Sequence, residues 1–540
     1  MSTTAMKTIP MPTSRGAESG GGNYLSRAVA LHLAGEREAA LEQLRLAVAG
    51  GQASPEIYRA MGHIQFEMAA YQDAAKTYRL LTGMKPQYAM GWFNLAVSLE
   101  RLSSWEDAAL AFEKAAALDQ RNEAAHLGLG VCQLRLENPK PALYSFERCL
   151  ELNPDNEDGA FGKAAALQAL AHPDEAAQIY EGILARNPDS EESLSNLILI
   201  GMTKEDFDMV RDYSERLLDI RPESSVALEG LAAWSCAANE PALTAKFCTL
   251  LVSAVPGHFE GWFNLGLAHQ KSGRWEQAAE AYEEAVKLRP QSCEGHTNLG
   301  IVREHLNDRK GARAAYDRAM KANPDALAPM WNIALLLEHA GEAAEAERWY
   351  HAVLEKSPKE EEARFRLGFL RLQREDYRGA ADAFEACLRY RPNWPEAQAN
   401  LALCQAGMGD RAQAERIYTK MLDGDANSPD ALRGLAAMAV QSGDFEASLQ
   451  YHSRLIELGE RSAEVLYNAG LMHEKAGQLD KAASLYREAL EQQPDMAEAL
   501  LNLGRILEAS GKPVEARACW TRALEAEPAL AQGYFGPAID

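Results

Sequence analysis

Apolar side chains return along this chain at helical spacing, inside a longer period of 34 residues. In the segment 275–288 the spacing of three and four residues places one apolar face on a helix, and this face comprises Trp275, Ala278, Tyr282, Ala285 and Val286. The positions between them are mostly charged. The preceding segment, 259–271, has a second apolar face, and Gly273 between the two predicts a turn. The pattern predicts two amphipathic helices that pack as a hairpin.

Prolines fix the longer period, because eight of them recur at one phase, each 34 residues after the last: Pro154, Pro188, Pro222, Pro256, Pro290, Pro324, Pro358 and Pro392. Counted from this phase, fifteen units occupy residues 21–530 without insertion or deletion. Residues 1–20 are rich in Ser, Thr, Pro and Gly, and we expect a flexible leader there. Residues 531–540 form a short tail.

Three positions of the unit predict how the helices pack. Position 8 is Gly or Ala in fourteen units, position 20 is Ala in twelve, and position 24 is usually an aromatic ring. Glycine inside a helix costs about 0.5–1 kcal/mol relative to alanine, so its recurrence needs a packing reason. We expect the small residues to let the two helices approach closely, with the ring wedged between them and the next unit.

These positions resemble the tetratricopeptide repeat, whose pattern has an aromatic at 4, Leu at 7, Gly at 8, Ala at 20, an aromatic at 24, Ala at 27 and Pro at 32. The unit 259–292 matches nearly all of it. The resemblance implies an all-α, right-handed superhelix (α-solenoid) of about fifteen helix-turn-helix repeats. Units 191–258 diverge most, with Ile198 at position 8 and Ser214 and Cys248 at position 24. Compensated drift and a hinge both remain open there.

Composition limits the partners more than it identifies them. The chain has 55 Lys and Arg against 78 Asp and Glu, a formal charge of -23, which disfavours nucleic acid and anionic membrane surfaces. No apolar run approaches the length that spans a bilayer, so we expect no membrane insertion and a cytoplasmic protein. The eight cysteines lack metal-ligand spacing and predict reduced, mostly buried thiols.

Position 6 carries the main candidate for binding, an asparagine row that comprises Asn94, Asn196, Asn264, Asn298, Asn332, Asn400, Asn468 and Asn502. Asparagine is a mediocre helix former, so local stability does not explain its repeated use in mid-helix. A carboxamide can donate and accept one hydrogen bond each, which suits the backbone of an extended peptide. The alternative is that Asn at position 6 only follows the consensus of the repeat.

The asparagine row is similar to the repeat region of O-linked N-acetylglucosamine transferase and its bacterial relatives, where such a ladder lines the inside of the superhelix. Arg366 and Gly434 interrupt the row here, and the amino-terminal half is sparse. The longest unbroken run, Asn264 to Asn332, therefore marks the predicted centre of peptide binding. Specificity would come from apolar neighbours in the same units, namely Phe263, Leu267, Ile301, Trp331, Leu335, Phe365 and Phe369.

Acidic residues at position 2 of ten units would attract a basic segment, although the helix dipole alone also favours them there. They argue against a clamp for the carboxy-terminal tail of a heat-shock chaperone. No phosphate loop, nucleophile elbow or Cys-x-x-Cys motif occurs. His305 and His339, both at position 13, are most simply solvated. The sequence thus predicts no enzyme, no cofactor and no metal site.

The predicted function is a protein-interaction scaffold or adaptor that holds an extended protein segment in a concave groove. Two alternatives remain open: a non-catalytic, substrate-selecting subunit of a glycosyltransferase-type complex, and a structural assembly component that acts through its ends. The second alternative follows from the tail, which is too short for a full capping helix. The last hairpin would then stay uncovered unless Tyr534 and Phe535 fold back onto it. An uncovered last hairpin would allow self-association through the carboxy-terminal end.

Overall fold

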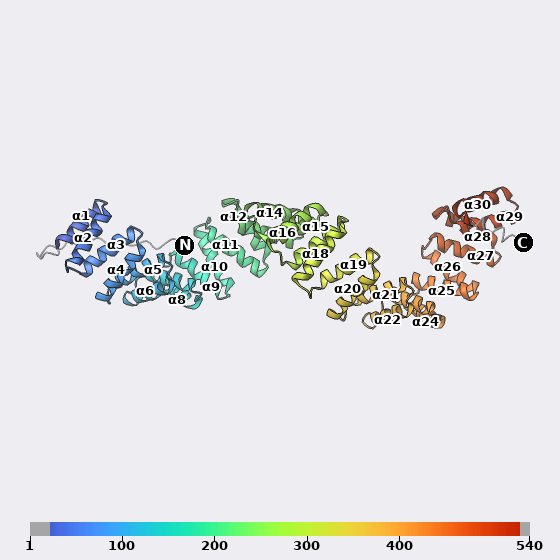
Figure 1. Ribbon diagram of the computed structural model, residues 1–540, viewed down its shortest axis with the longest axis horizontal. Coiled ribbons are helices and arrows are strands. Elements are labelled where there is room, and N and C mark those ends of the chain that lie inside the picture. Colours follow the sequence, from blue (N-terminus) through green and yellow to red (C-terminus); the bar gives the residue numbers. More distant parts are fainter. Residues whose placement is uncertain (1–21, 530–540) are drawn as a thin grey trace. The chain divides into compact units, whose positions relative to one another are not determined.

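The computed structural model describes residues 22–529, and every regular element within that range is an α-helix. Thirty helices pair into fifteen antiparallel hairpins of one helix-turn-helix repeat each, so the described chain is an all-α solenoid (Figure 1). The chain divides into two compact units, Met1–Leu288 and Arg289–Asp540. The leader 1–20 and the tail, with Tyr534 and Phe535, lie outside the described residues.

The first unit holds eight hairpins, whose helices are α1 (Gly22–Leu33), α2 (Arg37–Ala49), α3 (Pro55–Glu67), α4 (Tyr71–Met84), α5 (Ala89–Arg101), α6 (Trp105–Leu118), α7 (Glu123–Arg135), α8 (Pro139–Leu152), α9 (Glu157–Ala169), α10 (Pro173–Arg186), α11 (Glu191–Lys204), α12 (Phe207–Ile220), α13 (Ser225–Ala237), α14 (Pro241–Ala254), α15 (Phe259–Lys271) and α16 (Trp275–Leu288). Each helix packs chiefly against its neighbours in sequence. Odd-numbered helices are the first helices of their repeats.

The second unit holds seven hairpins of the same kind, whose helices are α17 (Cys293–His305), α18 (Arg309–Ala322), α19 (Leu327–His339), α20 (Ala343–Lys356), α21 (Glu361–Gln373), α22 (Tyr377–Leu388), α23 (Pro395–Gly407), α24 (Arg411–Gly424), α25 (Pro429–Ser442), α26 (Phe445–Glu457), α27 (Ala463–Lys475), α28 (Leu479–Gln492), α29 (Ala497–Ala509) and α30 (Pro513–Ala526). Among residues 22–529, no helix has the length and apolar character needed to cross a membrane.

A left-handed residue forms the turn of all fifteen hairpins, always at repeat position 15. Seven of these residues are glycines, such as Gly273 with a φ of 69°. The other eight have side chains, as in Glu205 with a φ of 56°, although this region is unfavourable for residues other than glycine. Helix packing therefore imposes this turn conformation even where the residue type disfavours it.

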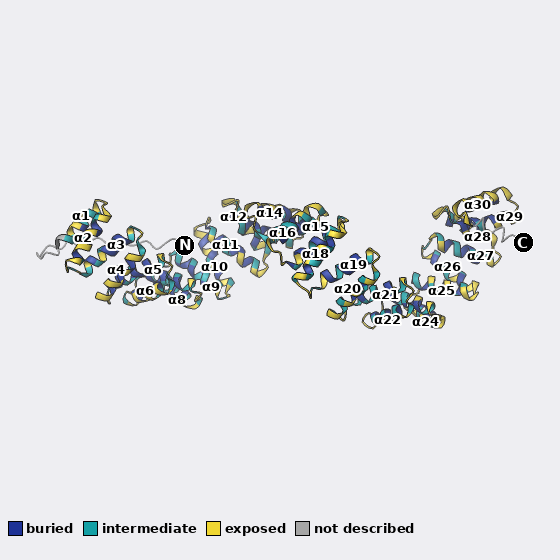
Figure 2. Ribbon diagram, in the orientation of Figure 1, coloured by how far each residue is buried: buried dark blue, intermediate teal, exposed yellow. Residues whose placement is uncertain are grey.

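The core repeats in every hairpin (Figure 2). All twelve alanines at position 20 have 0% exposed surface, which confirms them as the contact between the two helices of a hairpin. The ring at position 24 lies against position 8 of its own hairpin: a Cβ added at Gly300 would lie 2.3 Å from the ring of Tyr316. The small residue at position 8 thus makes room for the ring, as the sequence predicts.

The ring also reaches the next hairpin. A Cβ at Gly130 would lie 2.8 Å from Phe146, and one at Gly162, position 6 of the following hairpin, would lie 2.3 Å from the same ring. Phe146 is fully buried between these two glycines. Each ring therefore joins its hairpin to the next one.

First helices of successive hairpins contact one another directly at α5–α7, α7–α9, α11–α13 and α13–α15 in the first unit and at α17–α19, α21–α23 and α23–α25 in the second. Among the described helices, the second helices of successive hairpins show no contact of that extent. Because the first helices lie closer together, they line the inner side of the curvature within each unit.

The divergent repeats 191–258 keep a filled core. Where Ser214 replaces the ring, Ile198 at position 8 is fully buried and its methyl group would lie 3.0 Å from a Cβ at Gly230. In the next repeat the buried Thr244 hydroxyl donates to Ser235 at 3.0 Å. A large residue at position 8 thus offsets a small one at position 24, which is the compensation expected of drift. The division between the compact units falls after Leu288, outside these repeats.

We predict that Gly162→Ala lowers stability by about 1–3 kcal/mol, because its methyl group overlaps the Phe146 ring and overpacking carries a cost of this size. The matched control is Gly182→Ala in α10, where nothing lies within 4 Å of the added Cβ and the helix should gain about 0.5–1 kcal/mol. Urea denaturation followed by circular dichroism measures both. Equal urea midpoints for the two variants would contradict the close packing of the Phe146 ring against Gly162.

The eight cysteines are free, and Cys132, Cys149, Cys248, Cys387 and Cys404 are buried. Burial raises the pKa of Cys132, Cys149 and Cys248 to about 12 and the pKa of Cys387 and Cys404 to about 11. The sequence prediction of mostly buried thiols is therefore confirmed.

Because the thiolate is the reactive species, we predict that iodoacetamide at pH 8 modifies only Cys236, Cys293 and Cys519 in the folded protein. At a pKa of 12 a thiol is ionised to only about one part in ten thousand at this pH. Mass spectrometry counts the adducts, and unfolding in guanidinium should raise the number to eight. Rapid native labelling of Cys132 would show that the core opens.

Candidate functional site

The asparagine row lies on the first helices, and the row's side chains differ in how accessible they are. Seven of the eight residues are half-buried, whereas Asn502 is buried with 8% exposed surface. Within the described residues, the carboxamides of Asn196, Asn264, Asn332, Asn400 and Asn468 form no hydrogen bond with another residue. These five are the row members that remain available for a partner.

Asn502 differs because it bridges two repeats. Its Nδ2 donates to the Tyr467 hydroxyl at 3.3 Å and to the Tyr486 hydroxyl at 3.4 Å, and its Oδ1 accepts from Arg505 at 2.5 Å. The sequence analysis places this residue on the exposed row. The structure gives it a packing role, because the ring of the preceding repeat has a hydroxyl that reaches position 6.

The glycines that interrupt the asparagine row are also explained by the residue at position 24 of the preceding repeat. Gly128, Gly162 and Gly434 occupy position 6 where a ring of the preceding repeat presses on the helix backbone, and an added Cβ would lie 2.3–2.4 Å from that ring. Gly230 occupies position 6 behind the hydroxyl of Ser214, at 2.4 Å. Position 6 is therefore a packing position first, and a residue with a side chain fits only where the preceding ring leaves room.

Arg366 interrupts the row in a different way, through an ion pair. Its guanidinium lies 3.2 Å from Glu338 of the preceding repeat and 3.2 Å from Glu362 on its own helix. Glu338 also accepts a hydrogen bond from the Tyr350 hydroxyl at 2.6 Å. Burial, together with this carboxylate, raises the pKa of Tyr350 far above its ordinary value.

Carboxylates or carboxamides at position 12 repeat this contact with the ring of their own hairpin. Tyr282 donates to Gln270 at 2.9 Å, Tyr316 to Glu304 at 2.5 Å and Tyr486 to Glu474 at 2.7 Å. Position 12 follows position 9 on the first helix by almost one turn. The acids therefore add negative charge beside the asparagine row of the second unit.

The apolar residues predicted beside the asparagine row fall into two groups. At position 5 the aromatic side chains pack edge-on against the ring of their own hairpin, with ring centroids 5.7 Å apart for Phe263 and Tyr282, 5.5 Å for Trp331 and Tyr350 and 5.6 Å for Phe365 and Phe384. At position 9 the aliphatic or aromatic side chains are half-buried, and these are Leu267, Ile301, Leu335 and Phe369. The position-5 side chains are half-buried as well, so the two groups differ in their ring contacts rather than in their exposure.

The predicted centre of peptide binding does not lie in one compact unit. Asn264 belongs to the first unit, and Asn298 and Asn332 belong to the second. The second unit alone contains Asn298, Asn332, Asn400, Asn468 and Asn502 with their position-9 neighbours. It is the larger surface of this kind within one unit.

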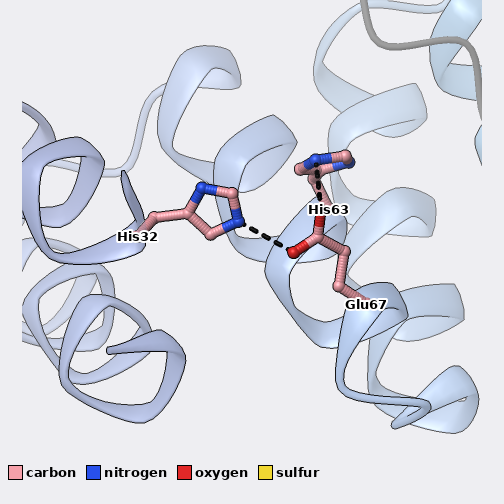
Figure 3. A group of neighbouring side chains, drawn as sticks. All are labelled: His32, His63 and Glu67. Carbon is pink, nitrogen blue, oxygen red and sulfur yellow. Dashed lines mark hydrogen bonds and ion pairs between the residues drawn. The ribbon is translucent and has the colours of Figure 1, made fainter. Parts of the chain in front are cut away.

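The sequence analysis missed a cluster at the start of the first unit (Figure 3). His32 Nε2 on α1 lies 2.9 Å from Glu67 Oε2 on α3, and His63 Nε2 lies 3.2 Å from Glu67 Oε1. Burial lowers the pKa of His63. Burial would raise the pKa of Glu67, but hydrogen bonds from His32 and Arg37 bring it below its ordinary value.

The repeat positions of these three residues could have predicted the cluster. His32 is at position 12, and His63 and Glu67 are at positions 9 and 13 of the next repeat. The fold therefore brings His32 to the other two, although it precedes them by 31 and 35 residues. The histidines that the sequence singled out, His305 and His339, are both exposed. Among residues 22–529, His32, His63 and Glu67 form the one group of three side chains suited to a metal ion.

Sequence models described as tetratricopeptide repeat match most of the chain, at residues 59–157, 137–198, 259–292, 297–361, 365–429, 439–497 and 474–533. No curated protein sequence matches it. The matches confirm the repeat pattern that the spacing predicts.

The chain is also similar to solved structures. One is yeast Tom70, with 15% identity, 83% of this chain and 96% of that chain covered and a TM-score of 0.35. Another is a tetratricopeptide repeat protein of Parabacteroides merdae, with 19% identity, 46% and 98% covered and a TM-score of 0.37. MamA has 25% identity, 31% and 97% covered and a TM-score of 0.28. At these TM-scores the similarity carries no functional argument.

We predict that Asn502→Ala and Asn332→Ala differ in their effect on stability, because Asn502 has a packing role whereas Asn332 is available to bind a partner. Asn502→Ala removes two hydrogen bonds to tyrosine hydroxyls and, at about 0.5–1.5 kcal/mol for each bond, should cost about 1–3 kcal/mol. Asn332→Ala removes a side chain without a partner and should change stability by less than about 0.5 kcal/mol. Thermal denaturation compares them. Similar losses in both variants would show that the whole asparagine row serves packing.

Proposed function

Because this chain belongs to the tetratricopeptide repeat family, we propose that it is a protein-interaction scaffold or adaptor that binds an extended polypeptide segment in a concave groove along its first helices. Repeats of this family typically act as non-catalytic interaction scaffolds, and a general scaffold role fits all fifteen units. The bound segment, its site and a cytoplasmic location are parts of the proposal.

The observation that carries the proposal is the set of unpartnered carboxamides on the inner side of the curvature. Asn332 and Asn400 in the second unit are half-buried and form no hydrogen bond within the described chain, so their carboxamides are available to a partner. An extended backbone presents the N–H and C=O groups that such a side chain can satisfy. The apolar position-9 side chains of Ile301, Leu335 and Phe369 would then contact alternate side chains of the segment.

The negative charge of this surface affects which polypeptide segments can bind to it. Glu304 and Glu338 lie at position 12, and the exposed Glu294, Glu396, Glu464 and Glu498 lie at position 2 of the second unit's first helices. The tyrosine hydroxyls and Arg366 satisfy only part of this negative charge. A basic or neutral segment is therefore favoured over an acidic one.

The free energy that these contacts can supply is consistent with a modest affinity. At about 0.5–1.5 kcal/mol net for each hydrogen bond, two or three carboxamides supply only part of the roughly 8 kcal/mol that a micromolar complex requires. The rest would come from apolar contacts at position 9, which bury surface at about 25 cal/mol per Å². With contacts to the backbone alone, the site would bind segments of many different sequences.

We predict that replacing Asn332, Asn400 and Asn468 together with Ala lowers the affinity for captured protein segments at least tenfold. The loss follows from removing the hydrogen bonds that would hold the segment's backbone. Partners crosslinked to the wild-type chain would be identified by mass spectrometry, and the affinity of a synthetic peptide from the crosslinked region would be measured by fluorescence anisotropy.

The matched control replaces Asn323, Asn393 and Asn427, which are exposed asparagines in loops of the same unit. This control should bind as the wild type does. Unchanged binding by the Asn332, Asn400 and Asn468 variant, with crosslinks that map to second helices or to the ends, would favour the structural assembly role. Co-purification of a glycosyltransferase would favour the substrate-selecting role.

A further inference from the structure

We propose that His32, His63 and Glu67 form a binding site for a divalent transition-metal ion of the zinc type, which ties the first hairpin to the second. The site is independent of the peptide-binding proposal, because it lies on α1 and α3 at the start of the first unit.

The donor set and its geometry carry the inference. Two imidazoles and one carboxylate are the ligands of many three-residue zinc sites, in which water takes the fourth position. Zinc at about 2.0–2.1 Å from each tetrahedral ligand needs donor atoms separated by about 3.3 Å. His32 Nε2 lies 2.9 Å from Glu67 Oε2, and His63 Nε2 lies 3.2 Å from the other oxygen, Oε1. One donor atom from each of the three residues lies within 4.8 Å of the other two, so a modest side-chain adjustment would bring the set to zinc-ligand spacing.

The helices hold the donors in this arrangement before an ion binds. His63 and Glu67 are four residues apart on α3 and therefore share one face, while α1 directs His32 toward them (Figure 3). The side chains of His32, His63 and Glu67 expose 26%, 32% and 28% of their surface. An ion can therefore enter from solvent without a local opening of the fold.

The carboxylate already has a competing cation. Arg37 Nε lies 3.0 Å from Glu67 Oε2, the oxygen that also accepts from His32. Its side chain is half-exposed, so it can leave at small cost, but its charge opposes a second cation beside Glu67. Metal binding should therefore be stronger when Arg37 is replaced, which a cluster held only by hydrogen bonds would not show.

A bound ion would add a link between two helices that have little direct contact. Among the described helices, α1 packs chiefly against α2 and only slightly against α3. An ion coordinated by His32 on α1 and by His63 and Glu67 on α3 would link the two hairpins without enlarging the core. The proposed role is therefore to stabilise the packing of the hairpin α1–α2 against α3.

Isothermal titration of the untagged, full-length chain with Zn²⁺ tests the proposal. We expect one equivalent bound by the wild type, none at this site in His32→Ala, His63→Ala or Glu67→Gln, and tighter binding in Arg37→Gln. Titration with Co²⁺ reports the ligand geometry, because a four-coordinate site gives intense visible absorption. The absence of a one-equivalent transition in the wild type would overturn the site.

His172→Ala is the matched control, since His172 also pairs with a carboxylate, Glu175 at 3.1 Å, but has no second imidazole near it. This variant should bind as the wild type does. Hydrogen exchange of residues 22–33 gives a second readout, which should slow on addition of Zn²⁺ in the wild type and stay unchanged in Glu67→Gln. Equal zinc affinity in the wild type and Glu67→Gln would place the ion elsewhere, and the proposal would fail.

Discussion

The contact on which the structure depends is the aromatic ring at position 24, which lies between the first helix of its own hairpin and the first helix of the next. Gly130 and Gly162 show both sides of this contact around the single ring of Phe146. The fully buried alanines at position 20 bring the two helices of a hairpin close enough for the ring to reach both neighbours. One side chain per repeat thus combines packing within a hairpin with packing between hairpins.

The same contact decides which surface is left for partners. Position 6 lies against position 24 of the preceding repeat, and Gly128, Gly162 and Gly434 occur where a ring at that position lies too close for a Cβ. A tyrosine hydroxyl at that point can bind the carboxamide, as at Asn502, and remove it from the available surface. The arrangement of rings along the chain therefore sets the arrangement of candidate binding side chains.

The 34-residue period was enough to predict the helices, their pairing and the burial of the position-20 alanines, because these depend on contacts that recur in every repeat. The sequence could not predict that Asn502 is buried, since that depends on which ring precedes it. It also gave no sign that Glu205 or Asn239 adopts a left-handed turn. His32, His63 and Glu67 were missed because each looks ordinary until adjacent repeats are set side by side.

Since each ring touches only its own hairpin and the next, the array is a series of nearest-neighbour couplings, and its cooperativity cannot extend beyond its weakest coupling. An aromatic side chain buries about 150–250 Å², considerably more than serine or cysteine can. Ser214 and Cys248 replace the ring at two successive couplings, and Ile198 restores only the first. The helices α14 and α15 nevertheless pack extensively beside Cys248, so we expect unfolding to begin instead where successive hairpins share the least contact, at α2–α3, α10–α11, α18–α19 and α20–α21.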